Sequence, residues 1–310
     1  MASPLTESQF VRLLDDRLTK VSEDAYGDLP TMIPRLFNVM STEKAWEEFF
    51  SIGAVPDIPR FTGQLDYLSI APGFHIKIEP AEFAAGIQFE RKLIEDKRYN
   101  VLESKTAGLM KAAKRTQDKT AARLFQYAFS ASFDFQTNEE GVALCSNSHT
   151  TKSGTSTSTG FDNLGTTALS KTSLAAARIA MTQFRNDISE RIDMDDSWIL
   201  LVPSNLADTA WEIVNTQRGY EASTTAAMKE NSAYDRYKVV EYMRLDDVDT
   251  NNWFLINESM MKDHLFWMDR VKPEFNTDVD FETFILKASV YFRCACGWTD
   301  WRWIYGSQVS

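Results

Sequence analysis

The sequence predicts an α+β fold with an extended body, and three stretches carry this prediction. Apolar and polar residues alternate from Phe284 to Cys296, which is the pattern of a strand with one buried face. Such a strand spans roughly 43 Å, whereas ordinary strands have about 5–6 residues. A helical pattern covers 97–130, and "SWILLVPSNLADTAWEIVNT" at 197–216 predicts an apolar strand followed by a helix. A chain of 310 residues has room for two such bodies.

The first forty residues are predicted to form an arm with little core of its own. Apolar side chains recur at helical spacing over 4–24, which indicates a short amphipathic helix. Pro30 and Pro34 then break the helical pattern. Such a segment could be a tail, or an arm that docks on a neighbouring molecule.

The next stretch is predicted to combine a helix with a projecting hairpin. "STEKAWEEFF" at 41–50 indicates a helix with a Ser/Thr cap at its start. Within 62–92, Phe74, Ile76 and Ile78 alternate with polar residues, and prolines interrupt the strands on both sides. Because this excursion is half-polar on both faces, we expect it to stay outside the core of this chain.

The long helix at 97–130 carries a concentration of positive charge. It holds 8 basic and 2 acidic residues from Lys97 to Arg123, a net charge of +6, whereas the whole chain has a net charge of −11. Four cations repeat every fourth residue and form a basic ridge: Lys111, Arg115, Lys119 and Arg123. The ridge could face a polyanion or an acidic neighbour, or be a solvated helix face.

The remaining elements follow in order. We expect a small-residue loop at 141–165, a helix at 168–186, a long polar loop at 217–235, and strands at 237–245 and 253–258.

Composition excludes several classes of function. The acidic balance disfavours a dedicated reader of duplex DNA, which normally carries a basic face. No apolar run approaches the ~20 residues of a membrane span, and the first residues lack the pattern of a secretory signal. Three cysteines, an odd number, favour a reducing compartment over a disulfide framework.

The residues that could suggest chemistry are better explained by packing. Cys294 and Cys296 fall on the apolar face of the long strand, and two cysteines supply only half the ligands of a structural zinc. Cys145 and His149 lack a third group to orient them as nucleophile and base. Acidic clusters, such as that around Asp195, lie beside strands and indicate solvated turns. We therefore predict no catalytic residue, no metal site and no cofactor.

The order of these elements resembles the major capsid proteins of tailed phages with the HK97-type fold, especially the Mu-like major head subunits. "FTGQLDYLSIAPGFHIKIEPAEFAAGIQFERKLIEDKRYNVL" is similar to the extended loop and spine helix of that family. "GVALCSNSHTT" is similar to the segment after the spine helix. Relatives often have a His-Pro step in this segment, and in this chain Thr150 follows His149 in place of the proline. "WILLVPSNLADTAWEIV" resembles the start of the axial domain, and "ASVYFRCACGWTDWRWIYG" the closing strand.

The resemblance implies a division of the chain into four parts. These are an N-terminal arm (1–40), an extended loop (62–92), a peripheral domain (41–61, 93–160 and 262–310) and an axial domain (161–261). It implies a major capsid (head) protein, without enzymatic activity, whose copies form the hexamers and pentamers of an icosahedral shell around double-stranded DNA. Phe74, Ile76 and Ile78 would then be intersubunit contacts.

The resemblance also implies partners and a place. A scaffold, a portal and a maturation protease are expected, together with non-specific contact between the shell and packaged DNA and no contact with a membrane. The protein would be assembled in the host cytoplasm and reside in the virion capsid. Two alternatives stay open: an encapsulin-like nanocompartment, which would enclose protein cargo, and a soluble enzyme that uses the acidic clusters.

Overall fold

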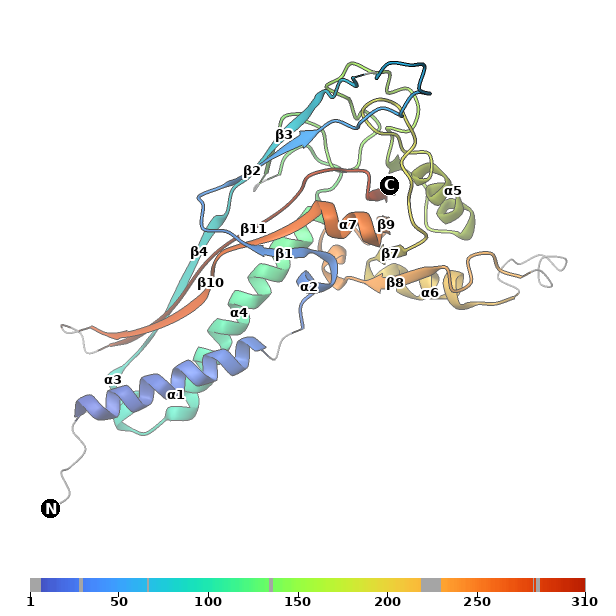
Figure 1. The fold of residues 1–310 in the computed structure, drawn as a ribbon. Coiled ribbons are helices and arrows are strands. Elements are labelled where there is room, and N and C mark those ends of the chain that lie inside the picture. The colour runs from blue at the N-terminus through green and yellow to red at the C-terminus, as the bar shows by residue number, and fades with distance from the viewer. Residues whose placement is uncertain are drawn as a thin grey trace.

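The computed structural model describes residues 7–27, 30–65, 67–133, 136–218, 230–280, 282 and 285–309, with side chains from residue 16 onward. The molecule is elongated: long strands and a long helix run side by side along one body, a second body with its own sheet lies at one end, and a narrow loop projects beyond both (Figure 1). This shape agrees with the extended body that the long alternating strand predicts.

The helices of the described residues are α1 (Glu7–Gly27), α2 (Ile33–Leu36), α3 (Arg91–Glu95), α4 (Tyr99–Gln126), α5 (Lys171–Met181), α6 (Ala207–Asn215) and α7 (Glu258–His264), with 3-10 turns η1 (Ser204–Leu206) and η3 (Met243–Asp247). Helix α1 lies against α4, and the predicted helices at 4–24, 97–130 and 168–186 are confirmed within the described residues. Ser170 caps α5 by accepting a hydrogen bond from the backbone N–H of Ser173.

The strands of the described residues form three sheets. The four-stranded sheet has the order β1 (Asn38–Ser41), β10 (Leu265–Val279), β11 (Leu286–Trp298), β4 (Ala81–Phe89). The five-stranded sheet has the order β6 (Leu164–Gly165), β12 (Ile304–Ser307), β9 (Trp253–Asn257), β7 (Trp198–Val202), β8 (Tyr237–Glu241). The three-stranded sheet has the order β2 (Glu47–Ile52), β3 (Pro72–Ile78), β5 (Gln136–Asn138).

Strand β11 is the centre of the long body. It pairs antiparallel with β10 from Trp298↔Leu265 to Leu286↔Val279, and antiparallel with β4 on its other side. Its even-numbered residues are buried and the odd-numbered residues before Ala295 are more exposed, as the alternation predicts. The buried face packs against α4.

An aromatic cluster among the described residues joins the two bodies. Phe125 of α4 makes edge contacts with Phe37, Phe254 and Trp303, at centroid distances of 6.1, 5.9 and 6.4 Å. Phe37 in turn contacts Trp267 of β10. Because these side chains come from the N-terminal arm, the long helix and both larger sheets, their burial fixes the bodies to each other.

The predicted helix at 41–50 is wrong. Strand β1 ends at Ser41 and β2 begins at Glu47, with a turn between them in which the Thr42 hydroxyl donates to Glu47 and accepts from the Lys44 N–H. Pairing with β3 and stacking of Phe49 on Phe266, at 5.3 Å between ring centroids, override the local helical preference.

The predicted hairpin within 62–92 is also wrong. Strand β3 pairs with β2 and β5, whereas β4 joins the four-stranded sheet through β11, and Pro80 separates the two strands. The projecting hairpin is therefore β2–β3, and its loop is 53–71. A second difference concerns β12, which lies in the five-stranded sheet although the resemblance implies that 262–310 belongs to the peripheral domain.

Candidate assembly surfaces

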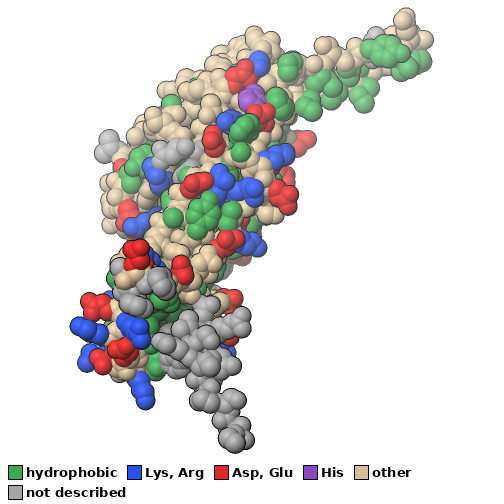
Figure 2. Space-filling model, turned by 90° about the vertical axis from the view of Figure 1, so that its left-hand side faces the viewer, with side chains coloured by type: hydrophobic (Ala, Val, Ile, Leu, Met, Phe, Trp, Pro, Cys, Tyr) green, Lys and Arg blue, Asp and Glu red, His purple; other side chains and the backbone are tan. Residues whose placement is uncertain are grey.

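The loop at 53–71 is the most apolar exposed segment described. Ile58 is 89% exposed, Leu65 72% and Phe61 70%, and further large apolar side chains are exposed along the same hairpin: Phe50, Ile52, Val55, Tyr67, Leu68 and Ile70. Figure 2 shows hydrophobic side chains covering the narrow projection at the upper right. A soluble monomer rarely exposes so large a contiguous apolar surface, so this projection has the character of a contact surface.

The intersubunit contacts predicted at Phe74, Ile76 and Ile78 need correction. Ile76 and Ile78 are 4% and 0% exposed and belong to the core of this chain, so they cannot contact a neighbour as well. Phe74 is only partly exposed and lines a cavity at the base of the loop. The sequence suggested two half-polar faces, but the end of β11 covers one of them, and β5 pairs with the edge of β3.

Gly297 in β11 is needed for that packing. A methyl group at its Cα would lie 2.6 Å from Cδ1 of Ile78 and 2.7 Å from Oε1 of Gln136. Gln136 also fixes β5 to the end of β11, because its amide donates to the carbonyl of Trp298 and accepts from the Trp298 N–H, at 3.0 and 2.9 Å. The three-stranded sheet is thus held to the body where the projecting loop begins.

The loop base is also held by carboxylates. The N–H of Ala54 donates to Asp187, at 2.8 Å, and the carboxylate of Glu139 accepts from the His75 N–H and from Lys152. Ala54, Lys152 and Asp187 line a cavity of about 230 Å³ between the loop base and the turn at 185–191. The projection is therefore anchored firmly at its base while its outer part stays exposed.

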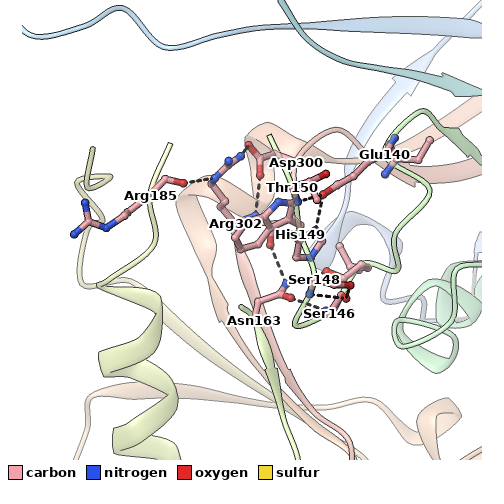
Figure 3. A network of polar contacts seen from close by, with 12 residues as sticks. Glu140, Ser146, Ser148, His149, Thr150, Asn163, Arg185, Asp300 and Arg302 are labelled. Atoms are coloured by element: carbon pink, nitrogen blue, oxygen red, sulfur yellow. Dashed lines mark hydrogen bonds and ion pairs between the residues drawn. The ribbon is translucent and has the colours of Figure 1, made fainter. Parts of the chain in front are cut away.

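His149 belongs to a buried polar network and not to a nucleophile–base pair (Figure 3). Its Nδ1 lies 3.2 Å from the Glu140 carboxylate, which also accepts from the Thr150 N–H, and its ring stacks on Trp301 at 4.1 Å between centroids. Cys145 is fully buried, and burial raises the pKa of its thiol. The pair that could have suggested catalysis is a packing arrangement.

Asp300 and Arg302 form an ion pair beside this network. The guanidinium lies 2.8 Å from the carboxylate and also donates to the carbonyl of Arg185. Burial by itself raises the pKa of Asp300, but the charges of Arg302 and His264 and the hydrogen bonds from Arg302 outweigh it and hold the pKa below its ordinary value. Asp300 therefore stabilises the fold in its ionised form.

Cys294 and Cys296 are both fully buried, as predicted from the alternation. Burial, followed by the nearby charge of Asp269, raises the pKa of the Cys294 thiol. Among the residues whose placement is described, no cluster of three or more His, Cys, Asp or Glu side chains is arranged to hold a metal ion. Within the same ranges, no helix combines the length and apolar character needed to cross a membrane.

The acidic clusters have structural roles in turns. Asp195 accepts hydrogen bonds from Ser197, Asn257 and Ser259, and the Ser259 contact is the main cause of its lowered pKa. Asp246 accepts from the N–H of Ser204 at the start of η1. These bonds fix loop ends, so the clusters give no support to the open alternative of an enzyme.

The basic ridge lies along α4 as its spacing predicts. Lys111, Arg115, Lys119 and Arg123 are all exposed. The first three have no ion-pair partner among the described side chains, whereas the guanidinium of Arg123 lies over the ring of Tyr127. The ridge is thus a preformed row of positive charge on an acidic protein.

Comparison with known sequences decides the family. The family model described as phage capsid protein matches residues 76–307, which is three quarters of the chain. The chain belongs to the phage capsid protein family. No curated protein sequence matches.

Solved structures show the same fold in capsids. The procapsid of bacteriophage JBD30 matches with a TM-score of 0.52 and 15% identity, over 98% of this chain and 76% of that chain. The mature capsid of bacteriophage PhiM1 matches with a TM-score of 0.58 and 11% identity, over 91% and 88%. The virus-like particle from Pyrococcus furiosus matches with a TM-score of 0.50 and 7% identity, over 94% and 98%.

These findings confirm the HK97-type fold and the role of a major capsid protein that forms the shell of a phage head. A particular closeness to Mu-like head subunits stays a prediction. The sequence reasoning missed the apolar surface at 50–61, because it assigned 41–50 to a helix and 41–61 to the peripheral domain. The signal was present: apolar side chains recur through that stretch with prolines and no helical period.

Proposed function

We propose that copies of this capsid protein assemble into hexamers and pentamers of an icosahedral head that encloses double-stranded DNA. The main support for this proposal is the apolar surface that the loop at 53–71 exposes. It lies at the tip of a rigidly based projection, beyond the core of its own chain. A neighbouring subunit is the surface that can cover it in every copy of a closed shell.

Burial of the loop between subunits is energetically favourable. Covering one large apolar side chain is worth roughly 1.5–3 kcal/mol, before the cost of ordering the loop. Nine such side chains line the hairpin from Phe50 to Ile70. The projection can therefore stabilise a subunit contact without any further change in the body of the chain.

The basic ridge is proposed to make non-specific contact with the packaged DNA. Its cations repeat at one-turn intervals, about 5–6 Å apart, and none of them is positioned by a base-reading motif. Such contact would weaken with salt, because counterions compete for the phosphates. Reversal of Lys111, Arg115 and Lys119 to Glu should lower DNA retention at low salt more than at high salt. Unchanged retention at both salt concentrations would leave the ridge as a solvated helix face.

The remaining partners follow from membership of the family and stay proposals. A scaffold, a portal and a maturation protease would act with the shell, which would form in the host cytoplasm. The role of this chain would be structural and not enzymatic, and we assign it no cofactor.

Expression of the chain with a scaffold, followed by sedimentation and electron microscopy, tests the proposal. We expect closed shells, or capsomers that convert to shells. In particles purified from infected cells, we expect the enclosed DNA to be protected from nuclease. A second candidate is a nanocompartment for protein cargo, because a shell fold does not by itself determine what the shell encloses. Shells that protect a protein and no DNA would favour it, and a monomer under all conditions would exclude both.

A further inference from the structure

A groove of about 570 Å³ lies between α4, the turn at 30–32 and the start of η3. Its volume lies within the range of sites that bind ligands, about 300–1,000 Å³. Pro30, Met32 and Met243 give it apolar walls, and Met243 is 64% exposed. Lys111 and Arg115 stand on the wall formed by α4. The groove thus combines apolar side chains with part of the basic ridge.

Asp118 holds the walls of the groove together. Its carboxylate accepts hydrogen bonds from the N–H of Met32 and from the guanidinium of Arg244, at 3.3 and 2.7 Å, and its carbonyl accepts from the Tyr242 hydroxyl, at 2.8 Å. Arg244 and Asp118 are both mostly buried, and each neutralises the other. The groove is therefore preformed, and this ion pair adds no net charge to it.

The charge that remains in the groove is positive. The lining contains four cations and two carboxylates, a net charge of +2. Lys114 is engaged with the carbonyl and ring of Tyr26, and Glu241 accepts from Ser204. Lys111 and Arg115, one helical turn apart, have no ion-pair partner among the described residues. Their side chains can meet two carboxylates about 5–6 Å apart.

We propose that this groove binds a short acidic segment of a partner protein, in which an apolar side chain packs against Met32 and Met243 while neighbouring carboxylates pair with Lys111 and Arg115. Duplex DNA, which is proposed to contact the exposed ridge as a whole, fits the groove itself less well, because its phosphate backbone has no apolar group to place against the methionine walls. The rest of the chain is acidic, so an acidic partner is repelled elsewhere and attracted here. The groove and the loop at 53–71 consist of different residues, so the proposed binding of an acidic segment uses another surface than the proposed subunit contact.

Selection of peptides provides the test. The assembled protein, as shells or capsomers, is used to select from a library of randomised short peptides displayed on a carrier. Peptides that also bind a variant carrying Arg115→Glu and Met243→Ser are discarded. We expect the retained peptides to contain Asp or Glu next to Leu, Phe or Met. Retained peptides without acidic residues, or no peptide that depends on the groove, would overturn the proposal.

Single variants then separate the groove from the ridge. Arg115→Glu and Met243→Ser should each weaken the best peptide by about tenfold or more. Lys119→Glu, a charge reversal one turn further along α4, and Ile179→Ser, an exposed apolar residue on α5, serve as matched controls and should change binding far less. A duplex oligonucleotide that competes for the groove, with binding lost in Met243→Ser, would assign the site to nucleic acid and contradict the proposal.

Discussion

Replacement of Ile58, Phe61 and Leu65 together by Ser should abolish shell formation and leave the subunit folded. These three side chains are 89%, 70% and 72% exposed, so the folded monomer loses almost no buried apolar surface. In a shell, burial of the three would contribute roughly 4.5–9 kcal/mol per subunit contact, at about 1.5–3 kcal/mol each. Even the lower figure corresponds to a factor of about a thousand or more in the association constant.

The matched control is Ile78→Ala in β3. Ile78 is fully buried in the core, so this single change should cost about 2–5 kcal/mol of subunit stability and should lower the melting temperature. The two variants therefore separate a contact between subunits from a contact within one subunit, although their residues are close in sequence.

Sedimentation velocity and thermal unfolding of both variants provide the assay. We expect the triple variant to melt with the wild type but to sediment as free subunits or small oligomers. Shells of normal yield from the triple variant would refute the contact role of the loop. A triple variant that melts well below the wild type would place the loop in the core of the subunit, against its observed exposure.

Three further outcomes are expected. Gly297→Ala should destabilise the subunit by about 1–3 kcal/mol, because the added methyl group meets Ile78, and denaturant unfolding measures this loss; an unchanged midpoint would show that the neighbouring side chains move away freely. Replacement of Cys294 and Cys296 by Ala should give a modest loss of stability and no change in metal content by elemental analysis, whereas loss of a stoichiometric metal would contradict their packing role. Asp300 has a lowered pKa in the folded protein, so its stabilising effect is present above the unfolded pKa of about 3.9 and is lost as the pH falls through the folded value. Asp300→Asn should therefore lower stability at neutral pH and flatten its decline below about pH 4 in acid titration monitored by circular dichroism; an unflattened decline would assign the acid sensitivity to other groups.

Much of the fold could be predicted because local patterns and tertiary structure agree. Apolar and polar residues alternate along β11 because the strand is buried on one face. The alternation therefore predicted both that this segment is a strand and that the strand is long. The same holds for the buried face of α4 and for the apolar strand β7.

The predictions were wrong where pairing between strands distant in the sequence determines the secondary structure and the burial of side chains. Residues 41–50 contain good helix formers, yet β3 supplies a ladder that makes Glu47–Ile52 a strand. The location of Ile76 and Ile78 depends on β5, which lies about sixty residues away in the sequence and pairs with β3 for only three residues. A local pattern of apolar and polar residues cannot tell whether the apolar face meets its own chain or a neighbour.

Hydrogen exchange of the loop at 53–71, in free subunits and in purified particles of the same protein, measures directly whether a neighbouring subunit covers the loop. We expect rapid exchange in the free subunit and strong protection in the particle, while β11 is protected in both states. Particles in which the loop exchanges as rapidly as in the free subunit, or a chain that stays monomeric with a scaffold present, would contradict this role of the loop.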